Sequence, residues 1–425
     1  MMNRFFLLIT AGLFLAALIV PGCSARNASV PFTAYLTLQK GVPDEVGIDS
    51  GRLADIDAII AEAISKGDAP GAVVIIGKDN KIIWEKAYGN RRIRPFAEPM
   101  TPDTIFDLAS CSKVLGTSAM AMLLIQDGKL RLEDKVSKYI PEFAANGKDD
   151  VTVWNLMTHT SGLAAYCSWQ EADKLRGDKS TSDALIHYIA SLKKTYPTGD
   201  FYLYSCLNYL TLARVNETVA GESMHSFLQA RIWEPLGITG AGYILTPEQI
   251  ARTAPTSKGD STTGVGIVHD PLANYHRATA EHCPGNAGLF MDSHAMAVMA
   301  QLVLNRGMYN NIRIYQPDIV SLWTRPHITL PQYDSKKPGN KGETNRRALG
   351  WINYLDPPYV TPKAPDGSFL GHTGWTGTYI WVDQHSGTFL IFNTNTVHPD
   401  GDPKIHSYRG RITTVLRESI IQYRD

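Results

Sequence analysis

Strand-like segments lie near both ends of this chain, and a long stretch of helical patterning separates them. Residues 71–90 contain two apolar runs around the turn KDNK, which predicts a β-hairpin. Residues 367–396 contain further alternating runs around a turn at QHSG. Between them, apolar residues recur at helical spacing over residues 181–194, 207–221, 224–236 and 293–307. This order predicts an α+β fold: one antiparallel sheet built from both ends of the chain and flanked by helices, plus an inserted all-helical lobe.

The same pattern predicts how the chain is divided. We place an α/β lobe at about residues 42–105 and 340–425 and the helical lobe at about residues 106–339, with an active-site cleft between them. Of the 425 residues, 44% are hydrophobic, which is enough for one large two-lobed unit. The 41 Lys and Arg residues balance the 41 Asp and Glu residues, so the composition gives no sign of a nucleic-acid partner.

Residues 1–41 are expected to precede the fold. The apolar run FFLLITAGLFLAALIV is too short and too near the terminus for a usual membrane span. It ends in VPGC and resembles a bacterial lipoprotein signal, so residues 1–22 would be removed and Cys23 would carry the lipid. Residues 23–41 would form a tether that holds the protein at the cell envelope, on the periplasmic or extracellular face of a membrane. An ordinary secretory signal with a chance cysteine is the alternative.

A serine and a lysine stand three residues apart where a strand-like segment runs into an apolar helix pattern. Ser110 and Lys113, in SCSK, therefore face the same side of the first helical turn. A serine hydroxyl needs a nearby base, and a lysine becomes a base where burial disfavours its cation. The apolar run VLGTSAMAMLLI would provide that burial, and N–H groups at the helix start would face an oxyanion. The simpler alternative is Ser110 as a helix N-cap beside a surface lysine.

The SxxK pattern occurs a second time, at Ser191 in SLKK. That serine lies late in an ordinary amphipathic helix, and the two lysines after it are typical of a solvated helix end. Two further segments favour Ser110 instead. Tyr204 precedes a helix in YLYSCLNYL, and a tyrosine near a lysine loses its proton more easily. The run GHTGWTGT places His372 among glycines, where backbone can approach a substrate closely.

In this order and at these intervals, the segments resemble the serine β-lactamase and penicillin-binding protein superfamily, on the side of class C β-lactamases, D,D-peptidases of the S12 type and esterases. The resemblance runs from about residue 42 to the C-terminus and implies the β-lactamase-like fold. It implies that Ser110 is the nucleophile and that Lys113 and Tyr204 move protons. It also implies an oxyanion hole made by the N–H groups of Ser110 and Trp375. The strand beside the substrate would carry His372, Thr373 and Gly374.

Two positions depart from the family pattern. The third residue of the YxN element, usually Asn, is Cys206, and a thiol is a poor hydrogen-bond partner for a substrate amide. The first residue of the KTG element is His372, which is mostly neutral at pH 7, whereas lysine is a fixed cation for a substrate carboxylate. The peptidase and esterase branches that the chain resembles also use His here. We therefore expect β-lactam hydrolysis to be impaired more than acyl-enzyme chemistry itself.

One segment contains several potential zinc ligands. VHDPLANYHRATAEHC contains His269, His276, His282 and Cys283. Their spacing is irregular and HExxH is absent, so a loop at the rim of the cleft is the favoured interpretation. No metal and no other cofactor is expected.

Two smaller features have simple interpretations. His159 and Ser161 in THTSG predict a tight turn satisfied by its own hydroxyls rather than a catalytic pair. The cysteines after Cys23 fit no CxxC pattern, and a buried free thiol is expected for Cys111.

The sequence therefore predicts an exported serine hydrolase that cleaves an amide or ester bond through an acyl-enzyme on Ser110. Peptidoglycan peptides or muropeptides are the favoured substrates, with D,D-carboxypeptidase, amidase or weak β-lactamase activity. The expected partners are such a small-molecule or cell-wall peptide substrate and a membrane, through the lipid anchor. An esterase of the same fold is one alternative. A non-turnover penicillin-binding receptor or scaffold is another, against which the intact set of Ser110, Lys113 and Tyr204 speaks.

Overall fold

The computed structural model describes residues 37–256, 264–334, 336, 344–354, 368–399 and 405–421. The expected signal at residues 1–22, the lipid-bearing Cys23 and most of the expected tether lie outside the described residues. Residues 35–425 form one unit of the chain, and the description below concerns this unit alone. Within the described ranges, no helix is both long enough and apolar enough to cross a membrane.

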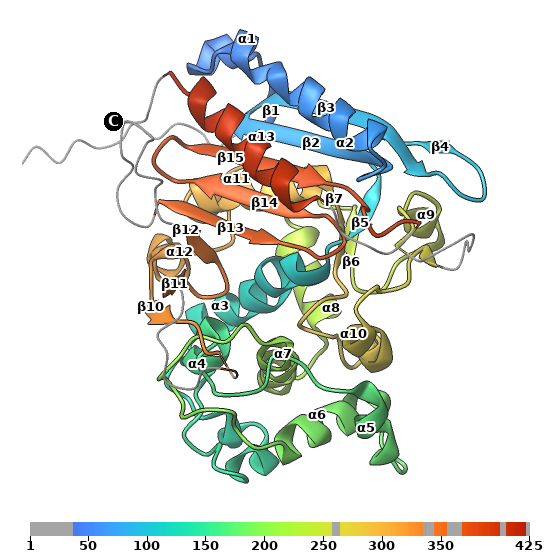
Figure 1. Ribbon diagram of the computed structural model, residues 1–425. Coiled ribbons are helices and arrows are strands. Elements are labelled where there is room, and N and C mark those ends of the chain that lie inside the picture. Colours follow the sequence, from blue (N-terminus) through green and yellow to red (C-terminus); the bar gives the residue numbers. More distant parts are fainter. Residues whose placement is uncertain are drawn as a thin grey trace, which may run out of the picture. The chain divides into compact units, whose positions relative to one another are not determined.

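One large sheet joins the two ends of the chain (Figure 1). Its strands follow the order β1-β3-β2-β15-β14-β13-β12-β11-β10, and all neighbours are antiparallel except β1 and β3. The first end supplies β1 (Gln39–Lys40), β2 (Gly71–Lys78), β3 (Lys81–Arg92) and, beside β3, β4 (Glu98–Pro99). The second end supplies β10 (Ile328–Pro331), β11 (Thr344–Arg347), β12 (Ile352–Tyr354), β13 (Phe369–Thr373), β14 (Tyr379–Asp383) and β15 (Thr388–Asn393). The predicted α+β fold and the β2–β3 hairpin are confirmed, and the last residues of the expected tether join the sheet as β1.

Strand β2 shows why both faces of the sheet carry helices. All of its residues are buried, although successive side chains point to opposite faces. Val73 and Ile75 pack into one hydrophobic core, and Val74 and Ile76 pack into another. Helix α11 (Ser293–Leu304) packs against the sheet in the first core, to which helices from the middle of the chain also contribute. Helices α2 (Asp55–Ser65) and α13 (His406–Ser419) contribute to the second core.

Helices from the middle of the chain gather below the sheet in the view of Figure 1. They are α3 (Ala119–Gln126), α4 (Val153–Thr158), α5 (Trp169–Lys174), α6 (Thr181–Ser191), α7 (Cys206–Ala220), α8 (Met224–Leu228) and α10 (Pro271–His276). The remaining elements are α1 (Ser50–Leu53), α9 (Pro247–Ala251), α12 (Pro317–Thr324), β8 (Met308–Tyr309) and β9 (Ile312–Arg313). The helical patterns at residues 181–194 and 207–221 are confirmed, with ends displaced by a few residues.

Helix α7 matters most for the site, because its start follows Tyr204. The Ser205 hydroxyl accepts hydrogen bonds from the N–H groups of Leu207 and Asn208 and so caps the helix. Gly221, with a φ of 75°, ends the helix in the left-handed conformation that glycine tolerates. The cap therefore determines where the Tyr204 loop stops and the helix begins.

Two elements inside the range 106–339 belong with the sheet rather than with the helices below it. Helix α11 packs against β2, β14 and β15, and β10 is the last strand of the sheet. Helix α11 covers the sheet because it is mostly apolar and all of its residues except His294 are buried. The lobe boundaries inferred from the sequence stay a prediction.

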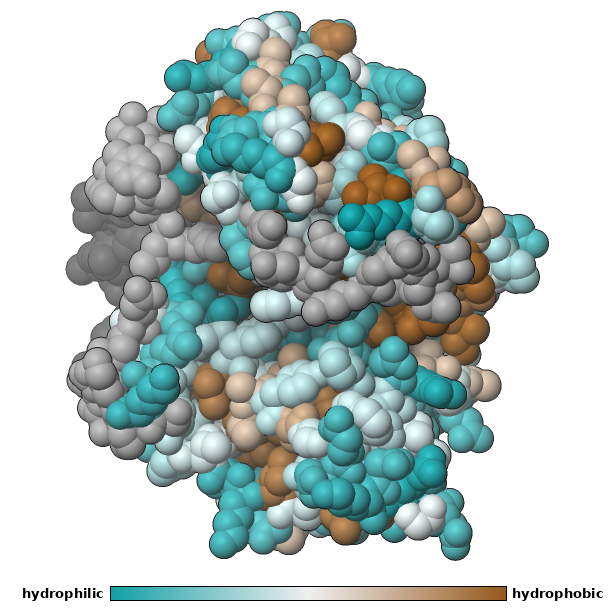
Figure 2. All heavy atoms as spheres, turned by 45° about the vertical axis from the view of Figure 1, so that its right-hand side comes forward, coloured by the Kyte–Doolittle hydropathy of each residue, from teal (hydrophilic) through white to brown (hydrophobic). Residues whose placement is uncertain are grey.

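A small second sheet holds the chain that leads to Ser110. Strand β5 (Ile105–Asp107) pairs with β7 (Phe290–Asp292), and β7 pairs with β6 (Ala241–Gly242). Figure 2 shows that one face of the molecule is hollowed across its middle.

Candidate active site

Ser110 lies on a short turn directly after β5. The turn is a 3-10 segment, Ala109–Cys111. Its residue Ala109 has a φ of 44°, a value that residues other than glycine rarely adopt. The Asp107 carboxylate accepts a hydrogen bond of 2.9 Å from the Ala109 N–H and so holds this backbone. A π-helical turn, Lys113–Ser118, follows and leads into α3; such turns are frequent at functional sites.

Hydrogen bonds fasten this turn to the loop after β13. Thr376 Oγ1 donates to the Asp107 carbonyl at 2.7 Å, and Thr378 Oγ1 donates to the Leu108 carbonyl at 2.8 Å. On the other side of the turn, the Cys111 thiol donates to the His372 carbonyl at 3.4 Å. The turn that carries Ser110 and the predicted substrate strand therefore form one braced unit.

The close approach of the two loops depends on Gly374. A Cβ atom at this position would strike both the Leu108 carbonyl and the Thr378 hydroxyl. The next residue, Trp375, has a backbone N–H without a hydrogen-bond partner in the part of the chain that the structure describes. Its N–H is available to an oxyanion beside Ser110, as the family resemblance implies.

Lys113 is fully buried behind Ser110. Its Nζ atom lies 3.0 Å from Ser110 Oγ, 2.7 Å from the Asn286 carbonyl and 3.7 Å from Cys206 Sγ. It also lies 4.9 Å from the centre of the Tyr204 ring. The three contacts match in number the three donors of an ammonium group.

The pKa shifts of the groups in this cluster depend on one another. Burial lowers the pKa of Lys113, whereas negative charge on Cys206 and Tyr204 raises it, and the net direction is upward. Burial also raises the pKa of Tyr204 and of Cys206, although Lys113 opposes both shifts. The upward shift of the Lys113 pKa therefore belongs to the site with an ionised neighbour; beside a neutral phenol and thiol, burial acts on the lysine without that opposing charge. The expectation that burial makes Lys113 a base stays a prediction.

His372 lies on β13 and is almost completely buried. Its Nδ1–H donates to the Thr373 carbonyl at 3.0 Å, which leaves Nε2 as an acceptor. That Nε2 is buried and makes no hydrogen bond with the described residues. Burial lowers the pKa of His372 well below its usual range, and the charges of Lys113 and Arg347 lower it further. His372 is therefore neutral at pH 7 and cannot replace a lysine as a cation.

A cavity of about 310 Å³ brings the predicted residues together. Its lining includes Ser110, Tyr204, His372, Thr373, Gly374 and Trp375. Cys206 is not part of this lining; it contacts Lys113 from behind. Two further basic residues line the cavity, Arg347 from β11 and His406 from the start of α13.

A family model described as beta-lactamase matches residues 56–414. The chain belongs to the beta-lactamase family. Over 409 residues it is 30% identical to a Salmonella paratyphi B protein named "Putative D-alanyl-D-alanine carboxypeptidase", an alignment that covers 88% of this chain and 89% of the relative. The resemblance inferred from the motifs is confirmed, and membership places the chain in a serine hydrolase superfamily.

Solved structures share the fold of this beta-lactamase family member. A penicillin-binding protein homolog from Caulobacter crescentus is 19% identical, with a TM-score of 0.67 over 88% of this chain and 99% of that one. A class C beta-lactamase is also 19% identical, with a TM-score of 0.67 over 88% of this chain and 98% of that one. The predicted β-lactamase-like fold is therefore confirmed.

Sequence reasoning missed three contributors to the site of this beta-lactamase family member. Arg347 lines the cavity but stands in the run NRRALGW, which has no recognisable motif. Asn286 supplies the carbonyl that holds Lys113, and its side-chain amide donates to Asp270 at 2.9 Å. Asp270 was noted only as part of a rim loop, and no spacing rule links it to the lysine.

The other candidate residues lie in ordinary structural roles. Ser191 donates to the Tyr188 carbonyl near the end of α6, on the surface. Ser161 accepts from the Leu163 N–H, two residues on, and donates to Asn208, so the predicted turn is confirmed. His159 instead accepts from the Ser205 N–H at 3.1 Å and packs against the Tyr204 ring.

The potential zinc ligands are used separately. His276 Nε2 meets Ser182 Oγ, His282 meets Glu217, and His269 meets the Thr256 carbonyl. Among the described residues, no group of three or more such side chains could hold a metal ion. The described cysteines are free thiols, and Cys111 is buried as predicted.

The two SxxK serines provide a matched test. We expect Ser110→Ala to abolish covalent labelling by an activated ester, because only Ser110 lies against a buried lysine and an oxyanion site. Intact-mass analysis after incubation with the ester measures the adduct. Ser191→Ala should label like the wild type. Loss of the adduct in a folded Ser191→Ala protein would show that the wrong serine was chosen.

Asp107 should impose an acid limb on the pH profile. Burial raises the pKa of Asp107 to about 6, although the N–H groups of His269 and Ala109 favour its charge. The ionised form accepts these hydrogen bonds, so labelling should fall by about tenfold from pH 7 to pH 5 as the carboxylate takes up a proton. Asp107→Asn cannot titrate, and its labelling rate should lack this step. An unchanged acid limb in that variant would contradict the assignment.

Proposed function

We propose that this protein is an exported serine hydrolase that removes a C-terminal residue from peptidoglycan peptides by a D,D-carboxypeptidase type of reaction. The observation that carries this proposal is the unpaired guanidinium of Arg347 in the same cavity as Ser110. A carboxypeptidase substrate bears a free carboxylate on its leaving residue, next to the bond that is cleaved.

The guanidinium of Arg347 has no anionic partner among the described residues. The residue is 9% exposed, and its Nε and Nη1 atoms are buried without a hydrogen-bond partner among the described residues. The guanidinium lies 4.6 Å from the centre of the Tyr202 ring, which holds it in place but does not neutralise it. A buried charge without a partner lowers the stability of the fold by several kcal/mol, about as much as removing one partner of a buried ion pair. A bidentate carboxylate from the substrate would supply the missing partner.

Arg347 also supplies what His372 lacks. His372 is neutral, with its free Nε2 limited to accepting a hydrogen bond at pH 7. The positive charge that a KTG lysine would provide on β13 is provided here from β11, two strands away in the sheet. The leaving residue would thus lie between β13 and β11, with its carboxylate on Arg347.

The reaction would begin with attack of Ser110 Oγ on the carbonyl carbon. The carbonyl oxygen would become an oxyanion held by the N–H groups of Ser110 and Trp375. The serine proton would pass to the Lys113–Tyr204 pair, which accepts it in the state where one of the two groups is already deprotonated. The tetrahedral intermediate would collapse with cleavage of the C–N bond, and the same pair would protonate the leaving amine. Water would then attack the acyl carbonyl and give its proton to the pair, which would return that proton to Ser110 Oγ as the bond from the acyl carbon to Oγ breaks.

One of the comparisons and one departure from the family pattern bear on the reaction class. The relative's name contains the same activity, which supports an amide substrate. Cys206 favours a second candidate, an esterase, because its thiol is directed to Lys113 and is a poor partner for a substrate amide. A lasting adduct without product would instead identify a non-turnover receptor.

We also propose that the protein is exported and held at the cell envelope by a lipid on Cys23. The support is the sequence at residues 1–22, where a short apolar run ends in VPGC. Peptidoglycan is found in that compartment, so the location and the substrate agree.

The role of Arg347 can be measured with a pair of substrates. We expect Arg347→Gln to lower kcat/KM by about tenfold to hundredfold for a peptide that ends in D-alanyl-D-alanine, because a charge-assisted hydrogen bond contributes about 1.5–3 kcal/mol. An ester without a carboxylate on its leaving group should lose much less. Steady-state kinetics of both substrates on both proteins give the comparison.

The neighbouring arginine is the control for that experiment. Arg346→Gln changes the same charge one residue away on β11, outside the lining of the cavity, and should leave both rates unchanged. Equal losses for the peptide and the ester in Arg347→Gln would show that Arg347 supports the fold of the cavity instead. Efficient turnover of the ester and none of the peptide would favour the esterase.

The anchor predicts where the protein is found. Cys23→Ser should move the protein from the membrane fraction to the soluble fraction after export, without unfolding it. One acyl chain binds membranes only marginally, so firm retention of the wild type would indicate more than one chain. Fractionation with immunoblotting measures this. Recovery of the exported wild type wholly in the soluble fraction would rule out the anchor.

A further inference from the structure

A second cavity, of about 560 Å³, lies beside the loop that carries Asp270. Its lining includes Trp169, Arg176, Thr181, His269, Tyr275 and Arg277. Trp169, Thr181 and Tyr275 belong to α5, α6 and α10, and the other three residues lie just before or after these helices. None of them lines the cavity that contains Ser110.

Short contacts connect this cavity to the catalytic centre. Its lining residues His269 and Pro271 flank Asp270 in the chain. Asp270 accepts from the Asn286 side chain at 2.9 Å, and the Asn286 carbonyl accepts from Lys113 at 2.7 Å. The cavity therefore begins one residue away from a carboxylate that helps to hold the lysine.

An aromatic platform forms one wall. The rings of Trp169 and Tyr275 are stacked, with centroids 5.4 Å apart and an angle of 26° between planes. Trp169 is nevertheless 36% exposed, and the nearby Tyr166 is 41% exposed. Tyr166 donates to Asp270 at 3.2 Å and so lies between the platform and the lysine. Rigid, exposed aromatic surface next to a catalytic centre is a binding surface for the apolar face of a ligand.

Several polar groups lie around the aromatic platform and could form hydrogen bonds or an ion pair with a ligand. Arg277 has no ion pair with the described residues, whereas Arg176 pairs with Asp173 at 3.3 Å. The backbone of Arg277 has a φ of 59° and a ψ of 145°, a strained combination for a residue with a side chain. A hydrogen bond of 2.9 Å from His276 Nδ1 to the Arg277 carbonyl stabilises it. His269 donates through Nδ1 to the Thr256 carbonyl, so its Nε2 can accept from a hydroxyl.

We propose that this cavity binds the sugar end of the acyl donor: an N-acetylhexosamine ring stacked on Trp169, with an acidic substituent at Arg277. A sugar ring has an apolar C–H face that packs on an aromatic ring and hydroxyls that take hydrogen bonds at its edge. This assignment rests on the proposed function for the identity of the substrate. It makes a sugar-linked peptide, rather than a free peptide, the preferred substrate.

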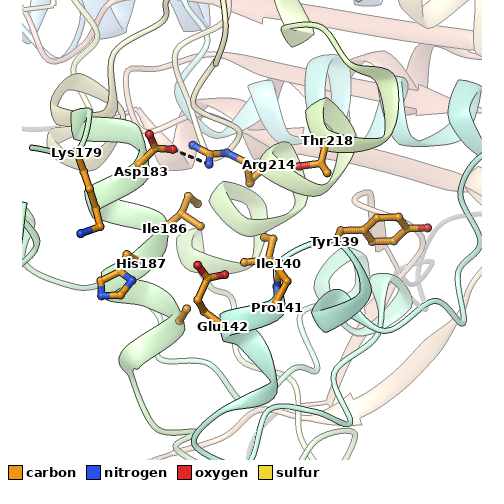
Figure 3. Close-up of a pocket in the computed structure, with 11 residues that line it drawn as sticks. Tyr139, Ile140, Pro141, Glu142, Lys179, Asp183, Ile186, His187, Arg214 and Thr218 are labelled. Atoms are coloured by element: carbon orange, nitrogen blue, oxygen red, sulfur yellow. Dashed lines mark hydrogen bonds and ion pairs between the residues drawn. The ribbon is translucent and has the colours of Figure 1, made fainter.

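A third cavity differs from the second one in its polar groups and its surroundings. It has a volume of about 330 Å³ and is lined by residues that include Tyr139, Glu142, Lys179, Asp183, His187 and Arg214. Figure 3 shows Asp183 and Arg214 pointing toward one another, and their ion pair measures 2.7 Å. The Tyr139 hydroxyl is likewise bound to Asp134. This cavity lacks both the stacked platform and the contacts to Lys113.

Binding can be tested without turnover. The probe is a disaccharide of two N-acetylhexosamines that carries a lactyl carboxylate, titrated into the Ser110→Ala protein by calorimetry. We expect binding, a loss of about tenfold or more in affinity with Trp169→Ala, and partial recovery with Trp169→Phe. Arg277→Gln should weaken this probe more than a neutral disaccharide. Phe96→Ala, which removes another exposed aromatic ring, should bind like the parent.

Kinetics separate this inference from the proposed function. With the natural Ser110, a peptide linked to the disaccharide should have a kcat/KM about tenfold above the bare peptide, and Trp169→Ala should remove that difference. Turnover of both peptides at equal rates would overturn the sugar site and leave the carboxypeptidase intact. Turnover of neither would overturn the carboxypeptidase, and the calorimetry would still decide the cavity. Absence of disaccharide binding, or equal binding by Trp169→Ala, would overturn the sugar site.

Discussion

The hydrogen bonds between the Ser110 turn and the loop after β13 are the constraint on which the rest of the site depends. Thr376 and Thr378 donate to the carbonyls of Asp107 and Leu108, so two segments about 270 residues apart become one rigid piece. The N–H groups of Ser110 and Trp375, which the family resemblance implies for an oxyanion hole, belong to these two segments. A displacement of either loop by about 1 Å would spoil the geometry that stabilises the developing charge.

Charge is distributed in an unusual way around this piece. Lys113 is buried, and its Nζ atom lies within hydrogen-bond distance of Ser110, Asn286 and Cys206. His372 stays neutral because burial and two neighbouring cations oppose its protonation. Arg347 therefore provides the remaining positive charge inside the cavity, where the solvent is partly excluded and a carboxylate would be bound strongly. The arrangement suits a substrate with one anionic end. In the proposal above, the other end of the substrate would bind in the second cavity, on the platform of Trp169 and Tyr275.

Asp107 and Asp270 link these features to the surrounding loops. Asp107 holds Ala109 and His269, and Asp270 holds Tyr166, Asn286 and the first turn of α10. Both carboxylates are used for orientation, since neither lines the cavity at Ser110. The residues His269 and Asp270 thus join the nucleophile turn, the lysine and the second cavity in one network, which would transmit a change at one of them to the others.

The sequence by itself determined the sheet from both chain ends, the principal helices and the Ser110–Lys113 pair. Periodicity and short spacing are local properties, and residues three apart on a helix face the same side in any fold that keeps the helix. Only the tertiary structure decided that Arg347 enters the cavity, that Asn286 holds Lys113 and that Trp169 stacks on Tyr275. These contacts join residues from distant parts of the chain, so their geometry depends on strand order and loop packing. The groups that act on the pKa of Lys113 also belong to the tertiary structure, because the sequence pattern predicts the burial of the lysine but not that Cys206 and Tyr204 lie beside it.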